Sequence, residues 1–309
     1  MITVNNLVKR YKELLALNHL NLEVQDGEVL GLLGPNGSGK TTLINCILAL
    51  LSYDKGEIQV FGENLTQNTN HIKRQIGLVP QDVAVLENLT VQENIDFFCG
   101  LYIEDSATRK QYVEDAIAFV ELGEYRKFIP SKLSGGLKRR LNIACGIAHK
   151  PKLIFFDEPT VAVDAQSRNF ILDGIKKLNK EGCTIVYTSH YLEEVEEICT
   201  RIVIIDSGRS IASGTLNELK DSIATGEKIV VEFVHISEEE KQALQKLDGL
   251  ISMDKQGNEY HLHFEKGRNN LLALIEFIEK NNLSYNKLFS DKPSLNDVFL
   301  ALTGKELRD

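Results

Sequence analysis

Residues 34–42 read GPNGSGKTT, and this stretch decides the fold. It contains the pattern G-x-x-x-x-G-K-[ST], follows a strand expected at residues 28–33, and opens a helix expected from Lys40. Glycines let backbone N–H groups wrap the β- and γ-phosphates of a nucleotide, and a helix N-terminus adds a favourable dipole. Lys40 supplies a positive charge there, and the Thr41 hydroxyl is suited to bind Mg²⁺. The predicted phosphate-binding residues are Gly34, Pro35, Asn36, Gly37, Ser38, Gly39, Lys40, Thr41 and Thr42.

Two adjacent acids end a second informative stretch, KLIFFDEPT at residues 152–160. Asp157 and Glu158 follow an apolar run typical of a buried strand, where carboxylates are costly unless they bind a cation or accept hydrogen bonds. We expect Asp157 to hold Mg²⁺, through a water molecule, and Glu158 to polarise the attacking water. Pairing of these acids with a structural arginine is the alternative.

The expected order of strands and helices predicts an α/β domain. Strand-like runs lie at residues 2–8, 20–24, 28–33, 152–157, 183–189 and 201–206, and an amphipathic helix starts at Tyr191. Helical patterns such as TVQENIDFFCGLY predict a helical insertion at about residues 88–150. Further on, KIVVEFV and EYHLHFE alternate with two helical runs. We therefore expect a nucleotide-binding domain at residues 1–222 and a small α+β domain at residues 223–309.

Composition restricts the classes of function. The 309 residues carry a formal net charge of −9, which argues against a nucleic-acid-binding protein. The five cysteines form no C-x-x-C pair, which favours a reduced cytosolic compartment. The sequence opens without a secretory signal, so we expect no export, and its apolar runs fall short of the ~20 residues that span a bilayer. Action at a membrane would need another subunit.

The stretch LSGG at residues 133–136 is the third motif. Ser134 alone could be an ordinary helix cap. Lying ahead of FFDEPT, however, LSGG resembles the signature of ATP-binding cassette (ABC) ATPases, and the resemblance covers about residues 1–220. Four further positions match motifs of this family: Tyr11, Gln81 in VPQD, Asp164 in VAVD and His190 in YTSH.

The resemblance implies a mixed-sheet core with a helical insertion, and a role for each matched residue. Tyr11 would stack on adenine, Gln81 would contact the metal and the attacking water, and His190 would contact the γ-phosphate. Asp164 takes the D-loop position. The family sandwiches two nucleotides between head-to-tail protomers, so Ser134, Gly135 and Gly136 would meet the γ-phosphate held by the other protomer.

The sequence also resembles one branch of this family, the ATPase subunits of daunorubicin- and linearmycin-resistance exporters. SGGLKRRLNIACGIAHKPKLIFFDEPT carries this likeness, together with PSLNDVFLALTGKELRD from Pro293. Leu137 departs from the usual LSGGQ, but the backbone and Ser134 contacts remain available. The branch implies an ATPase that binds MgATP, forms a dimer, most simply a homodimer, and drives a separate membrane permease. The chain would lie at the cytoplasmic face of the plasma membrane, and residues 81–102 would form the groove that receives a permease helix.

Several alternatives stay open at this point. The chain could be an importer ATPase with a substrate-sensing terminal domain, or a soluble ABC ATPase without a permease. The terminal domain could strengthen dimerisation, regulate hydrolysis or bind an effector, with structural support as the default. Lys138, Arg139 and Arg140 either add positive potential or form a solvated, acid-paired helix face. His261 and His263 are interpreted as one polar face of a strand.

Overall fold

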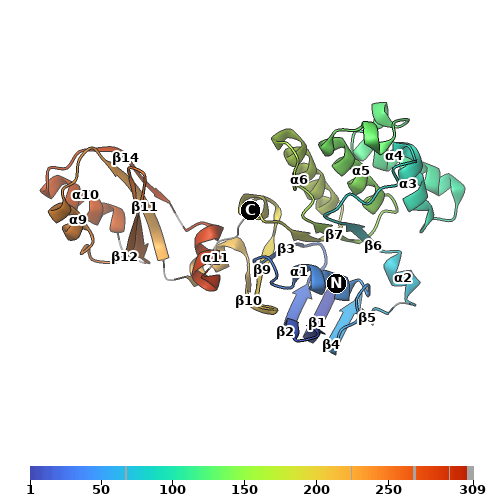
Figure 1. Cartoon of the computed structure of the whole chain (residues 1–309), viewed down its shortest axis with the longest axis horizontal. Helices are drawn as coiled ribbons and strands as arrows, with labels where there is room; N and C mark the ends of the chain where they lie inside the picture. Colours follow the sequence, from blue (N-terminus) through green and yellow to red (C-terminus); the bar gives the residue numbers. More distant parts are fainter. Residues whose placement is uncertain (67, 224, 267–268, 292, 305–309) are drawn as a thin grey trace. The chain divides into compact units, whose positions relative to one another are not determined.

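The computed structural model describes residues 1–66, 68–223, 225–266, 269–291 and 293–304. The chain forms two compact units, Met1–Thr215 and Leu216–Glu306 (Figure 1). The expected division into domains after residue 222 stays a prediction. Within the described residues, no helix is long and apolar enough to cross a membrane.

A six-stranded sheet forms the centre of the first unit, in the order β10-β9-β3-β8-β7-β6. Its strands are β3 (Val29–Leu33), β6 (Ile76–Val79), β7 (Leu153–Asp157), β8 (Thr184–Thr188), β9 (Arg201–Asp206) and β10 (Arg209–Gly214). All pairings are parallel except that of β9 with β10. Every residue of β3 and β8 is buried, as expected for a sheet covered on both faces. The carboxyl ends of the parallel strands therefore lie along one edge, where GPNGSGKTT begins.

A second, antiparallel sheet has the order β2-β1-β4-β5. It contains β1 (Ile2–Tyr11), β2 (Leu14–Val24), β4 (Lys55–Val60) and β5 (Glu63–Asn64). One apolar cluster joins it to helix α1 (Lys40–Ile47) and to the central sheet, as shown by Leu22, Ile44 and Phe155. The helix that follows the phosphate loop is thus held by a continuous core.

Six further helices belong to the described part of the first unit. They are α2 (Asn70–Lys73), α3 (Val91–Gly100), α4 (Ser106–Phe119), α5 (Gly135–Ile147), α6 (Ala165–Lys180) and α7 (Leu192–Ile198). Of these, α3, α4 and α5 lie within residues 88–150, where the helical insertion is expected. Short 3₁₀ turns lie at Gly123–Tyr125 and Pro130–Lys132. Thr90 and Glu93 form a capping box at the start of α3, which fixes where this helix begins.

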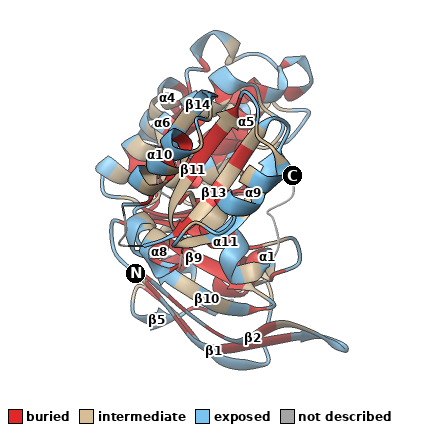
Figure 2. Cartoon of the chain, turned by 90° about the vertical axis from the view of Figure 1, so that its left-hand side faces the viewer, coloured by how far each residue is buried: buried red, intermediate tan, exposed pale blue. Residues whose placement is uncertain are grey.

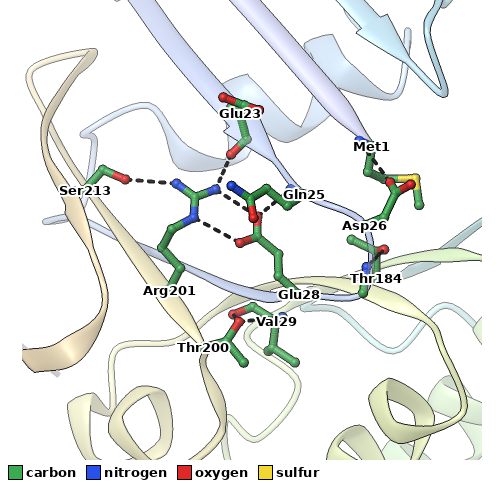
Figure 3. A network of polar contacts seen from close by, with 11 residues as sticks. Met1, Glu23, Gln25, Asp26, Glu28, Val29, Thr184, Thr200, Arg201 and Ser213 are labelled. Carbon is green, nitrogen blue, oxygen red and sulfur yellow. Dashed lines mark hydrogen bonds and ion pairs between the residues drawn. The ribbon is translucent and has the colours of Figure 1, made fainter.

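A polar network ties the two sheets together at the end opposite the phosphate loop (Figure 3). Arg201 donates from Nε to Glu28 Oε2 (2.9 Å) and from Nη2 to Glu28 Oε1 (2.8 Å). Arg201 Nη2 also donates to the carbonyl of Glu23 (2.5 Å), and Nη1 donates to Ser213 Oγ (3.0 Å). This network thus connects the end of β2 with β3, β9 and β10. The hydrogen bonds to Glu28 raise the pKa of Arg201.

The second unit is a small α+β fold. Its antiparallel sheet has the order β12-β13-β11-β14, with β11 (Thr225–Phe233), β12 (Leu250–Gln256), β13 (Glu259–Glu265) and β14 (Tyr285–Asp291). Its helices are α8 (Leu216–Ser222), α9 (Glu238–Leu244), α10 (Asn270–Lys280) and α11 (Leu295–Thr303). Buried positions alternate along β13, so Tyr260, Leu262 and Phe264 join the core, while His261 and His263 share the other face (Figure 2).

The described residues contain no cluster of three or more His, Cys, Asp or Glu side chains that could hold a metal. The last residues of PSLNDVFLALTGKELRD, 305–309, lie outside the described part.

Candidate nucleotide-binding site

The phosphate loop has the backbone that its glycines permit. Gly37 and Gly39 have positive φ angles of 79° and 107°. A Cβ on Gly39 would lie 2.7 Å from the carbonyl oxygen of Ala16, and a Cβ on Gly34 would lie 2.4 Å from Ser38 Oγ. Because the first amides of a helix have no carbonyl partner within it, the N–H groups at the start of α1 are available to an anion.

Lys40 is buried at the centre of this loop, with only 7% of its surface exposed. Its Nζ donates to the carbonyl of Gly34 (2.7 Å) and to that of Pro35 (3.3 Å). Burial lowers the pKa of Lys40, and the nearby Glu158 and Asp157 oppose this shift. The ammonium is therefore held by weak acceptors, which a phosphate group could replace with a stronger one.

Asp157 and Glu158 lie where β7 ends, as the sequence predicts. Thr188, the last residue of β8, donates from Oγ1 to Asp157 Oδ1 (2.6 Å) and accepts from the Glu158 N–H (3.0 Å). Burial is the main cause that raises the pKa of Asp157. Glu158 has a φ of 49°, a left-handed conformation that costs a residue with a Cβ on the order of 1 kcal/mol. The backbone at Glu158 is thus strained and fixed by Thr188.

Both carboxylate oxygens of Glu158 are hydrogen-bonded. Oε1 lies 2.6 Å from His190 Nε2, and Oε2 accepts from Gln81 Nε2 at 2.8 Å. The contact with His190 is the main cause that lowers the pKa of Glu158, so this carboxylate is ionised near neutral pH. Three residues that are far apart in the sequence therefore converge on one point.

A cavity of about 760 Å³ brings most of the predicted residues together. Its lining includes Tyr11, Asn36, Gly37, Ser38, Gly39, Lys40, Thr41, Thr42, Gln81, Glu158 and His190. Tyr11 is 44% exposed at the end of β1, which leaves its ring available for stacking. The lining does not include Gly34, Pro35 or Asp157, although the carbonyls of Gly34 and Pro35 accept from Lys40.

The signature residues lie elsewhere, at the start of α5. Ser134 caps this helix, because its Oγ accepts from the Leu137 N–H (3.3 Å). A Cβ on Gly136 would lie 2.2 Å from Ser167 Oγ, and Ser167 in turn donates to Asp164 Oδ2 (2.9 Å). Asp164 caps α6, the next long helix. None of these four residues lines the cavity: Ser134, Gly135 and Asp164 are exposed, whereas Gly136 is buried against Ser167.

The basic run after the signature is not a uniform solvated face. Lys138 and Arg140 are paired with acids, Glu87 at 3.7 Å and Glu121 at 3.6 Å. Arg139 is instead buried, and its guanidinium donates to the carbonyls of Gln81 (2.5 Å) and Val161 (3.4 Å). The interpretation of this run as a solvated, acid-paired face is therefore wrong for Arg139, and the added positive potential stays a prediction.

The residues present fit a nucleotide with Mg²⁺. Ser38 Oγ and His190 Nδ1 are buried polar atoms without a hydrogen-bond partner, so the site has unused polar capacity. Mg²⁺ is commonly held by one or two carboxylates, phosphate oxygens and water. One carboxylate at Asp157 and one hydroxyl at Thr41 agree with that pattern.

Several lining residues were not anticipated from the sequence. Tyr191, Ser207 and Gly208 line the cavity, and Thr188 orders both acids from behind. Only the position of Ser207 and Gly208 directly after a strand end offers a signal, because loops at that sheet edge gather at the site. A threonine inside an apolar strand gives none.

The phosphate loop lies at the carboxyl edge of a largely parallel sheet and faces two acids. This arrangement defines a phosphate-loop nucleotide-binding domain. Residues 17–161 match the family model "ABC transporter", and residues 214–303 match "ATP-binding protein DrrA1-3-like, C-terminal domain". The chain belongs to the ATP-binding cassette family, as an ATPase subunit of a transporter. The predicted fold class and the predicted resemblance to this branch are confirmed.

Full-length relatives support the assignment. The linearmycin resistance ATP-binding protein LnrL of Bacillus subtilis (strain 168) is 38% identical, with 100% of both chains covered. The daunorubicin/doxorubicin resistance ATP-binding protein DrrA of Streptomyces peucetius is 34% identical, over 100% of this chain and 94% of the relative. A Nod factor export ATP-binding protein I of Cupriavidus metallidurans is 33% identical, over 100% of this chain and 99% of the relative.

Solved structures match about 70% of the chain. A dimeric ATP-binding cassette in a post-hydrolysis state, bound to ADP and Pi, has a TM-score of 0.64 at 27% identity and covers 70% of this chain and 99% of its own. An ATP-binding subunit of an ABC transporter has a TM-score of 0.67 at 26% identity and covers 72% and 92%.

Proposed function

We propose that this chain is the ATPase of an exporter for an antibiotic, peptide or lipid, and that it drives a separate membrane permease. His190 and Gln81 converge on Glu158 beside the phosphate loop. This observation is the main support for an ATPase site. The names of the relatives, which refer to resistance to linearmycin and daunorubicin or to export of Nod factor, support the direction of transport.

Glu158 is the proposed general base for hydrolysis. The 2.8 Å contact from Gln81 occupies one acceptor position of the Glu158 carboxylate, so Gln81 would move aside if the attacking water takes that position. His190 would then hold one oxygen of Glu158 or turn to the γ-phosphate. Tyr11 would stack on adenine.

Bound Mg²⁺ would neutralise developing charge on the phosphate oxygens. Thr41, Asp157 and Gln81 are its proposed protein ligands. Asp157 suits this role because the hydroxyl of Thr188 occupies only one of its oxygens, at 2.6 Å.

Ser134, Gly135 and Gly136 are proposed to bind the γ-phosphate held by a second copy. Their place at a helix N-terminus offers N–H donors and a favourable dipole to an anion. The dimeric state of the matched cassette supports such a partner. The intact Glu158 and LSGG allow two competent sites in a homodimer.

The proposed permease contact is a second cavity, of about 310 Å³. Its lining includes Leu50, Phe98, Leu101 and Tyr102, and Leu50 and Leu101 are 66% and 57% exposed. Asn142, also in the lining, donates to the carbonyl of Pro80, directly before Gln81. A permease helix in this groove would therefore press on the segment that carries Gln81, and the chain would lie at the cytoplasmic face of the plasma membrane.

Affinity purification of the full chain from native membranes, followed by mass spectrometry, tests this proposal. We expect an integral membrane permease to co-purify with the chain, and Leu101→Glu to abolish its recovery while ATP binding persists. An exporter permease supports the proposal, whereas an importer permease would favour the substrate-sensing alternative. Recovery of no membrane partner from wild type would favour a soluble ATPase.

A further inference from the structure

Glu194 of α7 is a carboxylate in the protein interior, with 1% of its surface exposed. Its Oε1 accepts from Arg168 Nε (2.6 Å). Its Oε2 accepts from the hydroxyls of Tyr187 (2.6 Å), Ser189 (2.7 Å) and Thr160 (2.8 Å). A buried charge is tolerated only when such donors compensate its lost hydration, and a fully satisfied network holds one geometry.

The four donors come from the segments that form the ATPase site. Thr160 follows Glu158 by two residues, and Ser189 directly precedes His190. Arg168 belongs to the first turns of α6, and Tyr187 lies on β8. Glu194 therefore joins the loop after β7, the loop after β8 and the start of α6 at one carboxylate.

These contacts fix the residue that precedes His190 and the residue that follows it. Ser189 Oγ donates to Glu194 and also accepts from the Tyr191 N–H (3.0 Å). The Arg168 guanidinium lies over the Tyr191 ring at 4.7 Å from its centroid. Both neighbours of His190 are thus fixed through groups that Glu194 binds.

We propose that Glu194 is a positioning residue for ATP hydrolysis. Through Ser189 it fixes the loop that carries His190, and through Thr160 it fixes the loop that carries Glu158. The 2.6 Å contact between His190 and Glu158 depends on both loops. The proposal rests on the proposed roles of His190 and Glu158 in hydrolysis.

Ser189→Ala is the most selective variant. It removes one hydroxyl and leaves Glu194 with three donors, so the fold is retained. Thr184→Val is the control, because Thr184 lies on β8, the strand that ends directly before Ser189, is also buried, and loses a bond accepted from the Gly27 N–H (2.8 Å). We expect Ser189→Ala to lower kcat tenfold or more with KM for ATP within about twofold, since the hydroxyl makes two hydrogen bonds, to Glu194 and from the Tyr191 N–H, and each contributes about 1 kcal/mol. Thr184→Val should keep kcat.

A charge-removing pair gives independent evidence. Glu194→Gln keeps the size of the side chain but removes the charge that faces Arg168. Glu28→Gln is its control, because Glu28 is also buried against an arginine but lies in the network of Figure 3, outside the cavity. Only Glu194→Gln should lower kcat, by about tenfold.

The NMR resonances of the His190 ring, measured in the isotope-labelled full chain, report the local environment of His190. A change in overall stability alone does not shift them. Ser189→Ala should shift these resonances, whereas Thr184→Val should not. Unchanged resonances in Ser189→Ala, or an equal loss of kcat in variant and control, would overturn the proposal. Shifted resonances with wild-type kcat would instead contradict the proposed role of His190 in hydrolysis, so the two failures are distinguishable.

Discussion

Replacement of Glu158 by Gln tests the proposed general base with little change in shape. The amide oxygen can still accept from His190, and the Gln81 amide can rotate to accept from the new NH₂ group. General-base assistance is worth roughly 10² to 10⁴ in rate, which corresponds to about 3–5 kcal/mol of transition-state stabilisation. We therefore expect hydrolysis to fall by about three orders of magnitude in a folded protein.

The same substitution should strengthen ATP binding. The negative charge of Glu158 opposes the burial that lowers the pKa of Lys40 and adds to the burial that raises the pKa of Asp157, so its field reaches the centre of the site. Its removal lowers the repulsion that a triphosphate meets there. An ATP-bound dimer should accumulate, because the anion that joins the two protomers is no longer hydrolysed.

The ligand-free variant should be slightly less stable than wild type at neutral pH. The pKa of Glu158 is lowered in the folded state, so its contact with His190 stabilises the fold above the unfolded pKa. This contribution is lost as the pH falls through the folded pKa. The difference in melting temperature between wild type and Glu158→Gln should therefore shrink below about pH 4.

Single-turnover phosphate release and size-exclusion chromatography with MgATP measure the two main outcomes. Glu28→Gln, which removes a buried carboxylate outside the cavity, is the control and should hydrolyse ATP as wild type does. Hydrolysis by Glu158→Gln within about threefold of wild type would refute the assigned role.

Three further substitutions test other parts of the structure. Lys40→Ala removes a buried ammonium and should weaken ATP binding roughly 30-fold, about 2 kcal/mol, by calorimetry; an unchanged affinity would contradict the phosphate site. Gly136→Ala places a Cβ 2.2 Å from Ser167 Oγ and should reduce ATP-dependent dimerisation, and adding Ser167→Gly should restore it if the clash is the cause. Arg201→Ala breaks the pair with Glu28 and should lower the free energy of unfolding by about 2 kcal/mol. In a thermal scan this corresponds to a fall in melting temperature of about 4–8 °C. An unchanged melting temperature would show that the network in Figure 3 contributes no stability.

The sequence predicts the phosphate loop and four strands of the central sheet, β3, β7, β8 and β9, because each has a local signal, whereas β6 and β10 were not expected. The buried runs at β7 and β8 are continuous and apolar, and the glycines of the loop mark its positive φ angles. In the second unit, β13 alternates buried and half-buried positions and was anticipated, whereas β12 is mostly exposed and was not. A strand without a buried face has no period of two in its hydrophobicity.

The residues that the sequence does not reveal are those defined by contacts between distant segments. Glu194 lies in YLEEVEE, where four acids on one short helix all resemble a solvated face, and only its neighbours in space show that it is buried. Arg139 in KRR is a similar case, because its partners are backbone carbonyls at Gln81 and Val161. Side-chain type cannot distinguish these residues from their exposed neighbours.

These contacts also relate the two surfaces of the chain to each other. Helix α5 begins at the signature, which we propose binds the nucleotide of a second copy, and the same helix holds the carbonyl of Gln81 through Arg139. Gln81 in turn donates to Glu158 in the cavity of its own chain. Because Arg139 is buried and its guanidinium is rigid, a shift of α5 against the central sheet has to move Gln81 or break this bond. Engagement of the signature by a partner's nucleotide can therefore act on the hydrogen bond between Gln81 and Glu158.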